Sequence, residues 1–491
     1  MNRKFISILL VSFLFLSISP GWGYINYTLE NGVPRIPSNS IIEVKYDGQN
    51  IWIGTGEGLA VSSDDGETWV KYDSSNGLNA TSVSAVAASP GLVWVTTSGY
   101  EIVEGDLIPI GMGLNKGIIC PDTVVWSSHN PEQATWYGKI TYDLALLDTV
   151  IYAACFYGGL IRSTDGGATF ENIFPDSAAE YDYVNEIYAE ENNRFFSVMI
   201  DTLSPDTVIV YGGTAEGINK FIYHTSMAEA DTVFHYYRGD TLTQIDVQLP
   251  GNFVVALGVQ NFKGQKILWA GCRPALAGGA YAIAKSADGG ASWMNIFPDQ
   301  ECWNFSFQQD SIVWAATGDG LHRSYDLGAN WETFTYMRDT ENPNVFLEGN
   351  SFYSVEVVGD TVWAGGSDGL VKTTDGGVTW RVYRAYIPID ESGVESYAYP
   401  VPFSTRRGDG IVRVHYKPES NTNITIKIYD FALDLVKTVV SGKPVSAGVE
   451  YDDDFWDGKN SEGDEVANGV YFYNIDMDDG TQLWGKIVLL K

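Results

Sequence analysis

One short pattern, S-x-D-x-G-x-T-W, recurs five times along the chain and constrains its fold more than any other sequence feature. Serine, threonine and aspartate side chains bond backbone groups a residue or two onward, and glycine tolerates a positive φ. The closing aromatic residue favours a strand and packs against its neighbours. Each copy therefore predicts a β-hairpin turn locked by its own side chains. We name these segments the repeated turns, and their pattern residues are Ser62, Asp64, Gly66, Thr68 and Trp69; Ser163, Asp165, Gly167, Thr169 and Phe170; Ser286, Asp288, Gly290, Ser292 and Trp293; Ser324, Asp326, Gly328, Asn330 and Trp331; and Thr373, Asp375, Gly377, Thr379 and Trp380.

The repeated turns belong to a longer unit. Four of the five aspartates are preceded, at a distance of six residues, by a Gly-Leu pair, and an aromatic strand lies further upstream. Short alternating runs bounded by turn residues are typical of strands. The first unit is predicted to hold four strands, at residues 41–47, 50–55, 58–63 and 68–72. Four antiparallel strands repeated at about forty residues or more indicate a β-propeller blade.

The number of blades follows from an aromatic residue in the second strand of each unit. These residues are Trp52, Trp94, Tyr152, Tyr211, Trp269, Trp314 and Trp363. Trp126 lies too close to Tyr152 to mark a blade of its own, so we assign it to an elaborated second blade. We predict an all-β fold with a seven-bladed propeller over residues 24–390, eight blades being the alternative. Residues 25–30 are expected to add a closing strand to the last blade.

The repeated turns resemble the Asp-box (BNR) repeat found in sialidases, sortilin-like receptors and many secreted propellers. The resemblance implies the propeller fold and places the turns away from the binding face. We therefore interpret the five aspartates as turn locks, and not as catalytic acids, bases or metal ligands.

The first 23 residues have the layout of a cleaved secretory signal. Arg3 and Lys4 provide a basic start, and the apolar segment 5–18 is followed by two small glycines. That segment is shorter than the roughly 20 residues that span a bilayer. We predict a secreted or cell-surface protein whose mature chain begins near residue 24.

The formal net charge of −32 limits the possible partners. A strongly acidic chain repels phosphate backbones and anionic lipid surfaces. We therefore expect no nucleic acid, no membrane insertion and a monomeric protein.

Four cysteines occur, at Cys120, Cys155, Cys272 and Cys302. Export permits disulfides, and four cysteines allow three pairings. Cys155 and Cys272 follow the strand aromatic at equivalent places in two different units, so we expect small buried side chains there and not a disulfide framework. No Cys/His spacing indicates a zinc site, and we predict neither a metal nor a cofactor.

Residues 396–491 depart from the repeat. The segment 399–403 carries two prolines, and a long motif of the form W-D-G-x-N-x-x-G-x-x-V-A-x-G-V-Y-x-Y begins at Trp456. This tail resembles the FlgD-like immunoglobulin-type domain and the related C-terminal (type A) sorting domain of the bacterial type IX secretion pathway. The resemblance implies a separate β-sandwich and the type IX secretion machinery as a partner. Val401 departs from the usual Y-P-N-P-F opening of the sorting domain.

Insertions interrupt the regular spacing of the units at residues 98–145, 172–205, 214–265 and 335–350. Loops from several blades converge on one face of a propeller, where rigid scaffolds usually carry binding residues. We therefore predict a ligand-binding aromatic platform for a sugar or a peptide on these insertions, formed by Trp136, Tyr137, Tyr236, Tyr237 and Arg238.

Two classes of function fit the sequence. The first is a non-catalytic propeller that binds an extracellular polysaccharide or protein. The second is a sialidase-like or endoglucanase-like glycoside hydrolase, because sialidases and some endoglucanases have Asp-box propellers. The segment 34–37 (P-R-I-P) also resembles the F/Y-R-I-P motif of sialidases. A hydrolase needs two carboxyl groups across a cleft, and no such pair stands out among the 62 acidic residues. We favour the binding module and name no catalytic residue.

Overall fold

The computed structural model describes residues 25–28, 36–103, 106–121, 123–131, 140–156, 158–174, 194–224, 232–237, 245–246, 249–274, 279–342, 345–347, 349–385, 396–406 and 410–491. The predicted signal segment 1–23 lies outside these ranges. Every regular element in them is a β-strand. Among the same residues, no helix is long and apolar enough to cross a membrane. The all-β prediction is confirmed.

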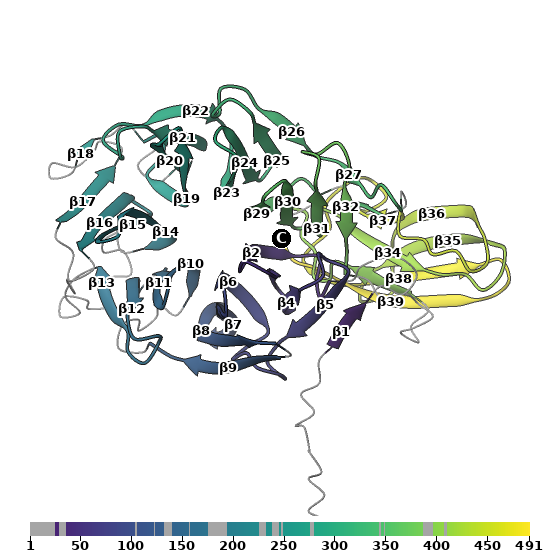
Figure 1. Cartoon of the computed structure of the whole chain (residues 1–491). Helices are drawn as coiled ribbons and strands as arrows, with labels where there is room; N and C mark the ends of the chain where they lie inside the picture. Colours follow the sequence, from purple (N-terminus) through teal and green to yellow (C-terminus); the bar gives the residue numbers. More distant parts are fainter. Residues whose placement is uncertain are drawn as a thin grey trace, which may run out of the picture.

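In the described residues, seven sheets follow one another around a ring, with the first strand of each sheet nearest the centre (Figure 1). Their strands are antiparallel, except for one short parallel pair at the outer edge of the fourth sheet. The arrangement is a β-propeller, and we number these sheets as blades 1 to 7. The strands of blades 1 to 4 are β2 (Ile41–Tyr46), β3 (Ile51–Thr55), β4 (Gly58–Ser62) and β5 (Thr68–Tyr72); β6 (Ser82–Ser89), β7 (Leu92–Val103), β8 (Asp106–Cys120) and β9 (Thr123–His129); β10 (Thr141–Leu147), β11 (Val150–Cys155), β12 (Gly159–Ser163) and β13 (Glu171–Phe174); and β14 (Phe195–Ser204), β15 (Thr207–Thr214), β16 (Gly217–His224), β17 (Thr232–Tyr237) and β18 (Ile245–Asp246). The strands of blades 5 to 7 are β19 (Phe253–Phe262), β20 (Gln265–Arg273), β21 (Ala282–Ser286) and β22 (Met294–Pro298); β23 (Cys302–Gln308), β24 (Ile312–Thr317), β25 (Gly320–Ser324) and β26 (Glu332–Phe334); and β29 (Phe352–Val358), β30 (Thr361–Gly366), β31 (Leu370–Thr373) and β32 (Arg381–Tyr383).

The expected closing strand takes a different place from the one we predicted. Strand β1 (Ile25–Thr28) pairs with β5, the outer strand of blade 1, and not with blade 7. Blade 7 already has a fourth strand of its own, β32, so residues 25–30 are not needed to complete it. The ring is closed by direct packing of blade 7 on blade 1, including a hydrogen bond from the Val44 N–H to Ser354 Oγ at 3.0 Å.

Two of the four predicted insertions are largely regular strand. Strands β7 and β8 form one long hairpin that occupies most of residues 92–120, and Trp126 lies in β9, the outer strand of the same blade. Much of residues 214–265 likewise belongs to β16, β17 and β19. The sequence pattern failed here because longer strands shift the spacing between blades as much as loops do.

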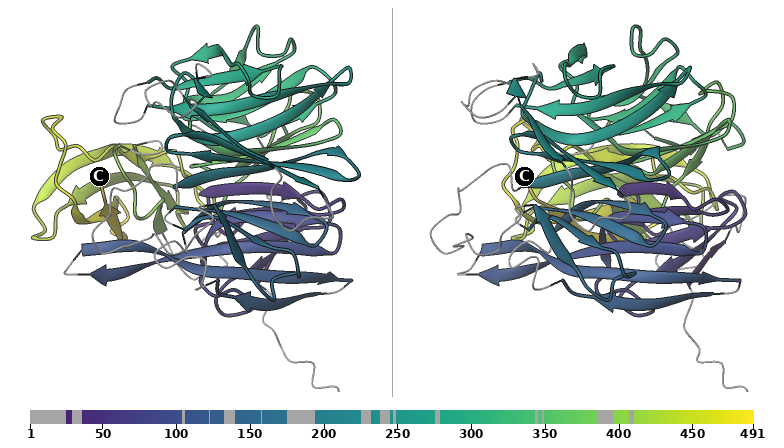
Figure 2. Two further views of the ribbon diagram at one scale, coloured as in Figure 1. Left: turned by 90° about the vertical axis from the view of Figure 1, so that its left-hand side faces the viewer. Right: turned by 60° about the vertical axis from the view of Figure 1, so that its left-hand side comes forward.

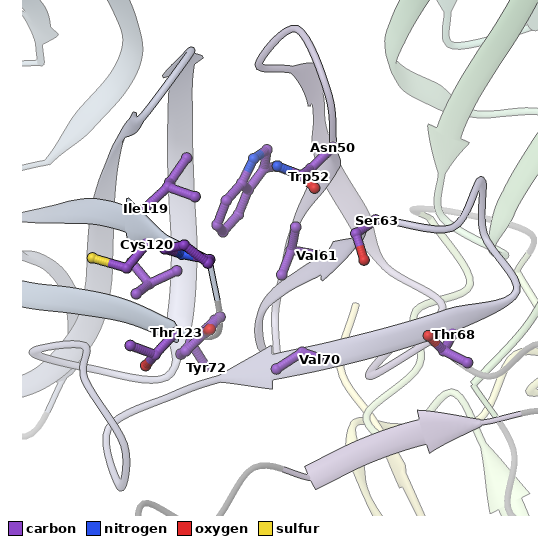
Figure 3. A pocket seen from close by; sticks show the side chains of 12 residues that line it. Asn50, Trp52, Val61, Ser63, Thr68, Val70, Tyr72, Ile119, Cys120 and Thr123 are labelled. Carbon is purple, nitrogen blue, oxygen red and sulfur yellow. The ribbon is translucent and has the colours of Figure 1, made fainter.

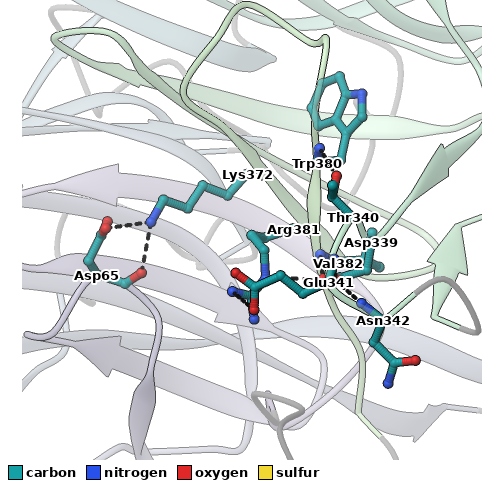
Figure 4. A network of polar contacts seen from close by, with 9 residues as sticks. All are labelled: Asp65, Asp339, Thr340, Glu341, Asn342, Lys372, Trp380, Arg381 and Val382. Carbon is teal, nitrogen blue, oxygen red and sulfur yellow. Dashed lines mark hydrogen bonds and ion pairs between the residues drawn. The ribbon is translucent and has the colours of Figure 1, made fainter.

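The insertion at 335–350 is tied to blade 7. Its short hairpin pairs β27 (Met337–Arg338) with β28 (Phe346–Leu347). The buried carboxylate of Asp339 accepts the Val382 N–H at 2.9 Å and the Asn342 N–H at 2.8 Å (Figure 4). Asp339, together with Thr340 and Glu341, therefore joins the insertion to the outer strand β32 and the residue before it.

The marker aromatics form the packing between blades. Trp52, Trp94, Trp269, Trp314 and Trp363 are almost completely buried. A Cβ added at Gly167 would lie 2.4 Å from the Trp94 ring, and one at Gly66 would lie 2.7 Å from the Trp363 ring. The glycine of a repeated turn is thus required twice, for its positive φ and for close approach to the tryptophan of the preceding blade.

A cation on the third strand of a blade adds a second contact between neighbouring blades. We name the boundary between two neighbouring blades a seam. In six blades the residue that pairs with the marker aromatic is a lysine or arginine, namely Lys116, Arg162, Lys220, Lys285, Arg323 and Lys372. We name these residues the cross-blade cations. Lys116, Lys220 and Lys285 donate to the carbonyl groups of Gly166, Gly289 and Leu327, each being the residue after the aspartate of the next blade's repeated turn. Lys372 does the same to Asp65 and also pairs with its carboxylate (Figure 4).

The four cysteines are free thiols, and Cys155 and Cys272 are buried as expected, as is Cys302. Cys155 and Thr55 hold equivalent places, opposite Thr141 and Ile41 in their respective strand pairs.

The C-terminal residues form two sheets around one separate hydrophobic core. One sheet holds β33 (Ser396–Tyr399), β34 (Val412–Tyr416) and β37 (Phe455–Trp456), and the other holds β36 (Leu435–Val445), β35 (Thr422–Tyr429), β38 (Gly469–Met477) and β39 (Gln482–Leu489). Ile426, Trp456 and Tyr473 are among its fully buried residues. The motif that begins at Trp456 thus runs from the end of β37 into β38 of a compact β unit.

The two units meet beside a buried ion pair of blade 7. Arg384, just after blade 7, donates to Asp368 at 2.8 Å, and the Arg384 guanidinium lies 5.0 Å from the Tyr399 ring. Arg413 of β34 lies 3.9 Å from the same carboxylate. The C-terminal unit is therefore anchored to the last blade through Asp368.

Candidate functional site

The two faces of the ring carry different kinds of connection. Because the strands of a blade alternate in direction, the turns between first and second strands and between third and fourth strands share one face, which includes the repeated turns. We name it the turn face. The turns between second and third strands and the links between blades share the other, which we name the link face. The far end of the β7–β8 hairpin and the C-terminal sheets project on one side of the ring (Figure 2).

All five repeated turns have the same hydrogen bonds. In the second copy, the Asp165 carboxylate accepts the Ser163 hydroxyl at 2.9 Å, the Thr169 N–H at 2.9 Å and the Thr169 hydroxyl at 2.6 Å. Hydrogen bonding to Thr169 holds the pKa of Asp165 at about 2. The Ser163 hydroxyl also accepts the Gly167 N–H at 2.8 Å. Every oxygen of the carboxylate is occupied within its own turn.

The predicted aromatic platform is not assembled among the described residues. Trp136, Tyr137 and Arg238 lie outside them. Tyr236 and Tyr237 lie in β17, an outer strand of blade 4, and not in an insertion loop as predicted. Tyr236 pairs with Ile218 near the link-face end of that strand.

A cavity of about 880 Å³ opens on the link face over blades 5, 6 and 7. Each blade contributes residues from strand ends or from links, as the antiparallel order requires. The lining residues are Arg273, Tyr281, Asp299, Glu301, Trp303, Gly318, Asp319, Ser351, Tyr353 and Arg406. Arg406 belongs to the C-terminal unit, so both parts of the protein contribute to this cavity.

Arg273 is the central polar group of the cavity. Its guanidinium forms an ion pair with Glu301 at 2.8 Å and lies 5.0 Å from the ring centre of Trp303. Tyr281 lies 5.8 Å away on another side. The Trp303 and Tyr353 rings meet edge to face at 6.3 Å. A planar cation held among aromatic rings is positioned without flexibility, which suits recognition of a polar ligand.

β-Bulges direct the aromatic rings of the cavity. Pairing of β23 with β24 shifts between Cys302 and Asn304, and pairing of β29 with β30 shifts between Phe352 and Ser354, which leaves Trp303 and Tyr353 as the extra residues. The next side chain in β23 fixes the bulge, because Asn304 accepts the N–H of Val355 in the neighbouring blade at 3.0 Å. Bulges commonly re-aim side chains beside functional sites.

A second charged cluster lies on the inner strands. Lys45 pairs with Glu43 at 2.8 Å, and burial raises the pKa of the nearby Asp143 and Glu356. The Asp143 carboxylate accepts the Val198 N–H of the next blade at 2.9 Å. This cluster connects the inner strands, and we assign it a structural role.

A smaller pocket of about 310 Å³ lies between blades 1 and 2 (Figure 3). Trp52, Val61 and Cys120 are among its lining residues, none of which is charged. Val61 pairs with Trp52 and occupies the place of a cross-blade cation. The pocket is therefore the space that a cation and a repeated turn fill at other seams.

The described residues contain no group of three or more His, Cys, Asp or Glu side chains that could hold a metal ion.

Comparisons with known proteins identify the fold. No family model and no curated protein matches the sequence. A GH74 enzyme from Niastella koreensis matches with a TM-score of 0.51 and 14% identity, over 94% of this chain and 73% of that one. A GH74 xyloglucanase from Xanthomonas campestris gives 0.49 and 14%, over 80% and 59%. PorZ, a surface component of the type IX secretion system of Porphyromonas gingivalis, gives 0.46 and 13%, over 92% and 60%.

At such identities, the match to the Niastella enzyme shows the β-propeller fold alone. The chain spans about 60% of the length of PorZ and of the xyloglucanase.

The sequence did not identify the cavity residues, because they come from three blades and a distant tail. A periodic signal was nevertheless present. Tyr142, Trp303 and Tyr353 each stand ten or eleven residues before the marker aromatic of their blade, where Ile42 and Ser84 stand in the first two blades. Aromatic residues at a position that other units fill differently point to a surface role.

Proposed function

We propose that this protein is a secreted or cell-surface bacterial propeller that binds an extracellular polysaccharide or protein without transforming it. The observation that carries this proposal is the link-face cavity, where Arg273, Trp303 and Tyr353 combine a fixed cation with aromatic rings. Ligand sites are typically concave, with apolar and aromatic walls and a few polar groups that fix orientation.

The repeated turns support the same proposal by their position. Their aspartates lie on the turn face, and each carboxylate is engaged by its own turn, as Asp64 is by Ser62 and Thr68. The cavity lies on the opposite face, where links from different blades can diverge without disturbing the turns.

Export is the second part of the proposal. The signal segment 1–23 would direct the chain across the inner membrane, and residues 396–491 would serve as a type IX sorting domain. The compact C-terminal β unit with its own core is compatible with that role.

Hydrolysis of a glycoside is the second candidate function. Asp299, Glu301 and Asp319 line one cavity, and glycosidases use two carboxyl groups placed across the bond that is cleaved. Glu301 is already paired with Arg273 at 2.8 Å.

A screen of the mature chain, residues 24–491, tests the proposal. We expect binding on an array of glycans and surface proteins, loss of that binding in Trp303→Ala, and no release of reducing sugar above a boiled control. Sugar release that disappears in Asp299→Asn or Asp319→Asn would replace the binding module with a hydrolase. Absence of any binding, or binding that Trp303→Ala leaves unchanged, would contradict the cavity as the site.

A further inference from the structure

The bulges of the inner strands place aromatic side chains at equivalent positions in four blades. In β10, β14, β23 and β29 the pairing shifts around one extra residue, which is Tyr142, Phe196, Trp303 or Tyr353. The first and second blades have Ile42 and Ser84 at this position. Blade 5 has Val255 at this position. The aromatic positions therefore lie in blades 3, 4, 6 and 7, and Phe253 at the start of β19 provides the aromatic ring of blade 5.

The rings contact one another along that part. Tyr142 lies 5.4 Å from Phe196, and Phe196 lies 4.2 Å from Phe253 at the start of blade 5. Arg273 continues the row, since its guanidinium lies 5.9 Å from Phe253 and 5.0 Å from Trp303. With Tyr353 beside Trp303, the contacts run without a break from blade 3 into the cavity. We name this row, from Tyr142 to Tyr353, the aromatic arc.

The arc is not part of the hydrophobic core. Tyr142 is 44% exposed, whereas a marker tryptophan that packs between two blades, such as Trp314, is fully buried. Phe196, Trp303 and Tyr353 are partly exposed. A contiguous row of exposed aromatic rings on a soluble protein marks an interaction site.

The charges around the arc are balanced, unlike those of the whole chain. The chain has 62 acidic and 30 basic residues. Around the arc, Arg194, Arg273 and Arg406 stand against Asp299, Glu301 and Asp319. Arg194 lies 5.9 Å from the Phe156 ring, which itself contacts Tyr142 and Phe196. A polyanion would be repelled by the chain as a whole, and a polycation would meet three guanidinium groups.

A neutral polymer of sugars fits both features. The flat apolar faces of pyranose rings cover aromatic side chains, and carboxylates and guanidinium groups bond the hydroxyls at their edges. A protein loop would place few planar surfaces in series, whereas a glycan repeats one at every unit.

We infer that the aromatic arc and the cavity together bind a single neutral polysaccharide strand, which lies across blades 3 to 7 with its end or a branch in the cavity. This inference rests on the proposed binding function and specifies its ligand class.

Length dependence of affinity tests the inference. The probes are neutral β-glucan oligosaccharides of two to eight units, and binding to the mature chain is measured by calorimetry. The affinity of the wild type should rise with length. The double variant Tyr142→Ala/Phe196→Ala should lose about tenfold or more in affinity for the longest probe, with no change for the shortest. Trp303→Ala should weaken binding of both.

Tyr325→Ala is the matched control, because Tyr325 is an equally exposed aromatic residue, at 56%, on the turn face. It should bind as the wild type does, and melting temperatures confirm that each variant is folded. Equal affinity of the double variant and the wild type for long probes would overturn the arc. Binding of a protein but of no neutral glycan would overturn the inference and leave the proposed function standing. Binding of neither would remove both.

Discussion

At the scale of single residues, the repeated turns show why their aspartates are structural. Each carboxylate accepts a hydrogen bond from the hydroxyl group two residues earlier. It accepts two more from the residue four positions later, one from the backbone N–H and one from the side chain. For Asp326 these residues are Ser324 and Asn330. These donors stabilise the charged form, and the bonds to Asn330 hold the pKa of Asp326 at about 2. Asp165 has the same value, set by Thr169.

This shift predicts how stability depends on pH. The folded pKa of Asp165 is below the value of about 3.9 in an unfolded chain. The stabilisation is therefore complete above about pH 4 and is lost as the pH falls towards 2. Asp165→Ala should lower the melting temperature at pH 7, and the difference from the wild type should shrink between pH 4 and pH 2. A difference that stays constant over this range would show that the charge is not what locks the turn.

The residue scale also shows what a sequence can and cannot reveal. The turn locks were predictable because Asp64 and its partners lie within seven residues of one another. The cavity was not, because Arg273 and Trp303 meet only after two blades have formed, and Arg406 arrives from the tail. The bulges that direct Trp303 and Tyr353 depend on pairing between strands, which no local pattern encodes.

At the scale of strands and blades, the cross-blade cations connect neighbouring sheets. Lys372 lies 5.1 Å from the Trp363 ring of its own blade and reaches the Asp65 carbonyl of blade 1 at 3.1 Å. The ammonium group is almost buried, whereas the Asp65 carboxylate is exposed. Most of the stabilisation should therefore come from the carbonyl and the ring, since exposed ion pairs contribute little.

Lys372→Met tests this contact, because methionine keeps an apolar stem over Trp363 and removes the donor. We expect the free energy of unfolding to fall by about 0.5–1.5 kcal/mol, the usual net contribution of a hydrogen bond, as measured by urea denaturation. Lys285→Met removes the equivalent donor to Leu327, at a seam that does not close the ring. If only one of the two variants lost stability, the contact would not be a general feature of the blades.

The strands themselves were largely predictable, with one instructive error. The four strands of blade 1 fall within a residue or two of the predicted ranges, because alternation and turn residues are local signals. The placement of residues 25–30 on the last blade was wrong, since it depended on which sheet edge is vacant. Strand β1 lies instead on β5.

At the scale of the whole molecule, a buried ion pair of blade 7 lies at the contact with the C-terminal unit, where Tyr399 and Arg413 approach it. Arg384 and Asp368 have side-chain exposures of 1% and 4%, and Arg384 also donates to the Phe346 carbonyl at 3.0 Å. Removing Arg384 takes the close partner away from the buried Asp368 carboxylate, which Arg413 approaches at 3.9 Å. Arg384→Ala should therefore lower stability by about 3–5 kcal/mol, measured by chemical denaturation.

A double replacement gives the control. Arg384→Leu with Asp368→Leu removes both charges and should be more stable than Arg384→Ala, because the Asp368 carboxylate is no longer buried without its close partner. If the double variant were as unstable as the single one, packing against Tyr399 and not the ion pair would hold the units together. Limited proteolysis between residues 386 and 395 would show whether the two units then separate.

The seam between blades 1 and 2 has a mechanical consequence. It is the place where Val61 replaces a cation and where the described residues leave a pocket of about 310 Å³ in place of a filled contact. A closed ring under tension parts first at its weakest joint. If the protein is pulled through its C-terminal end, we expect the ring to open first between Trp52 and Cys120, converting a circular array of blades into a linear one.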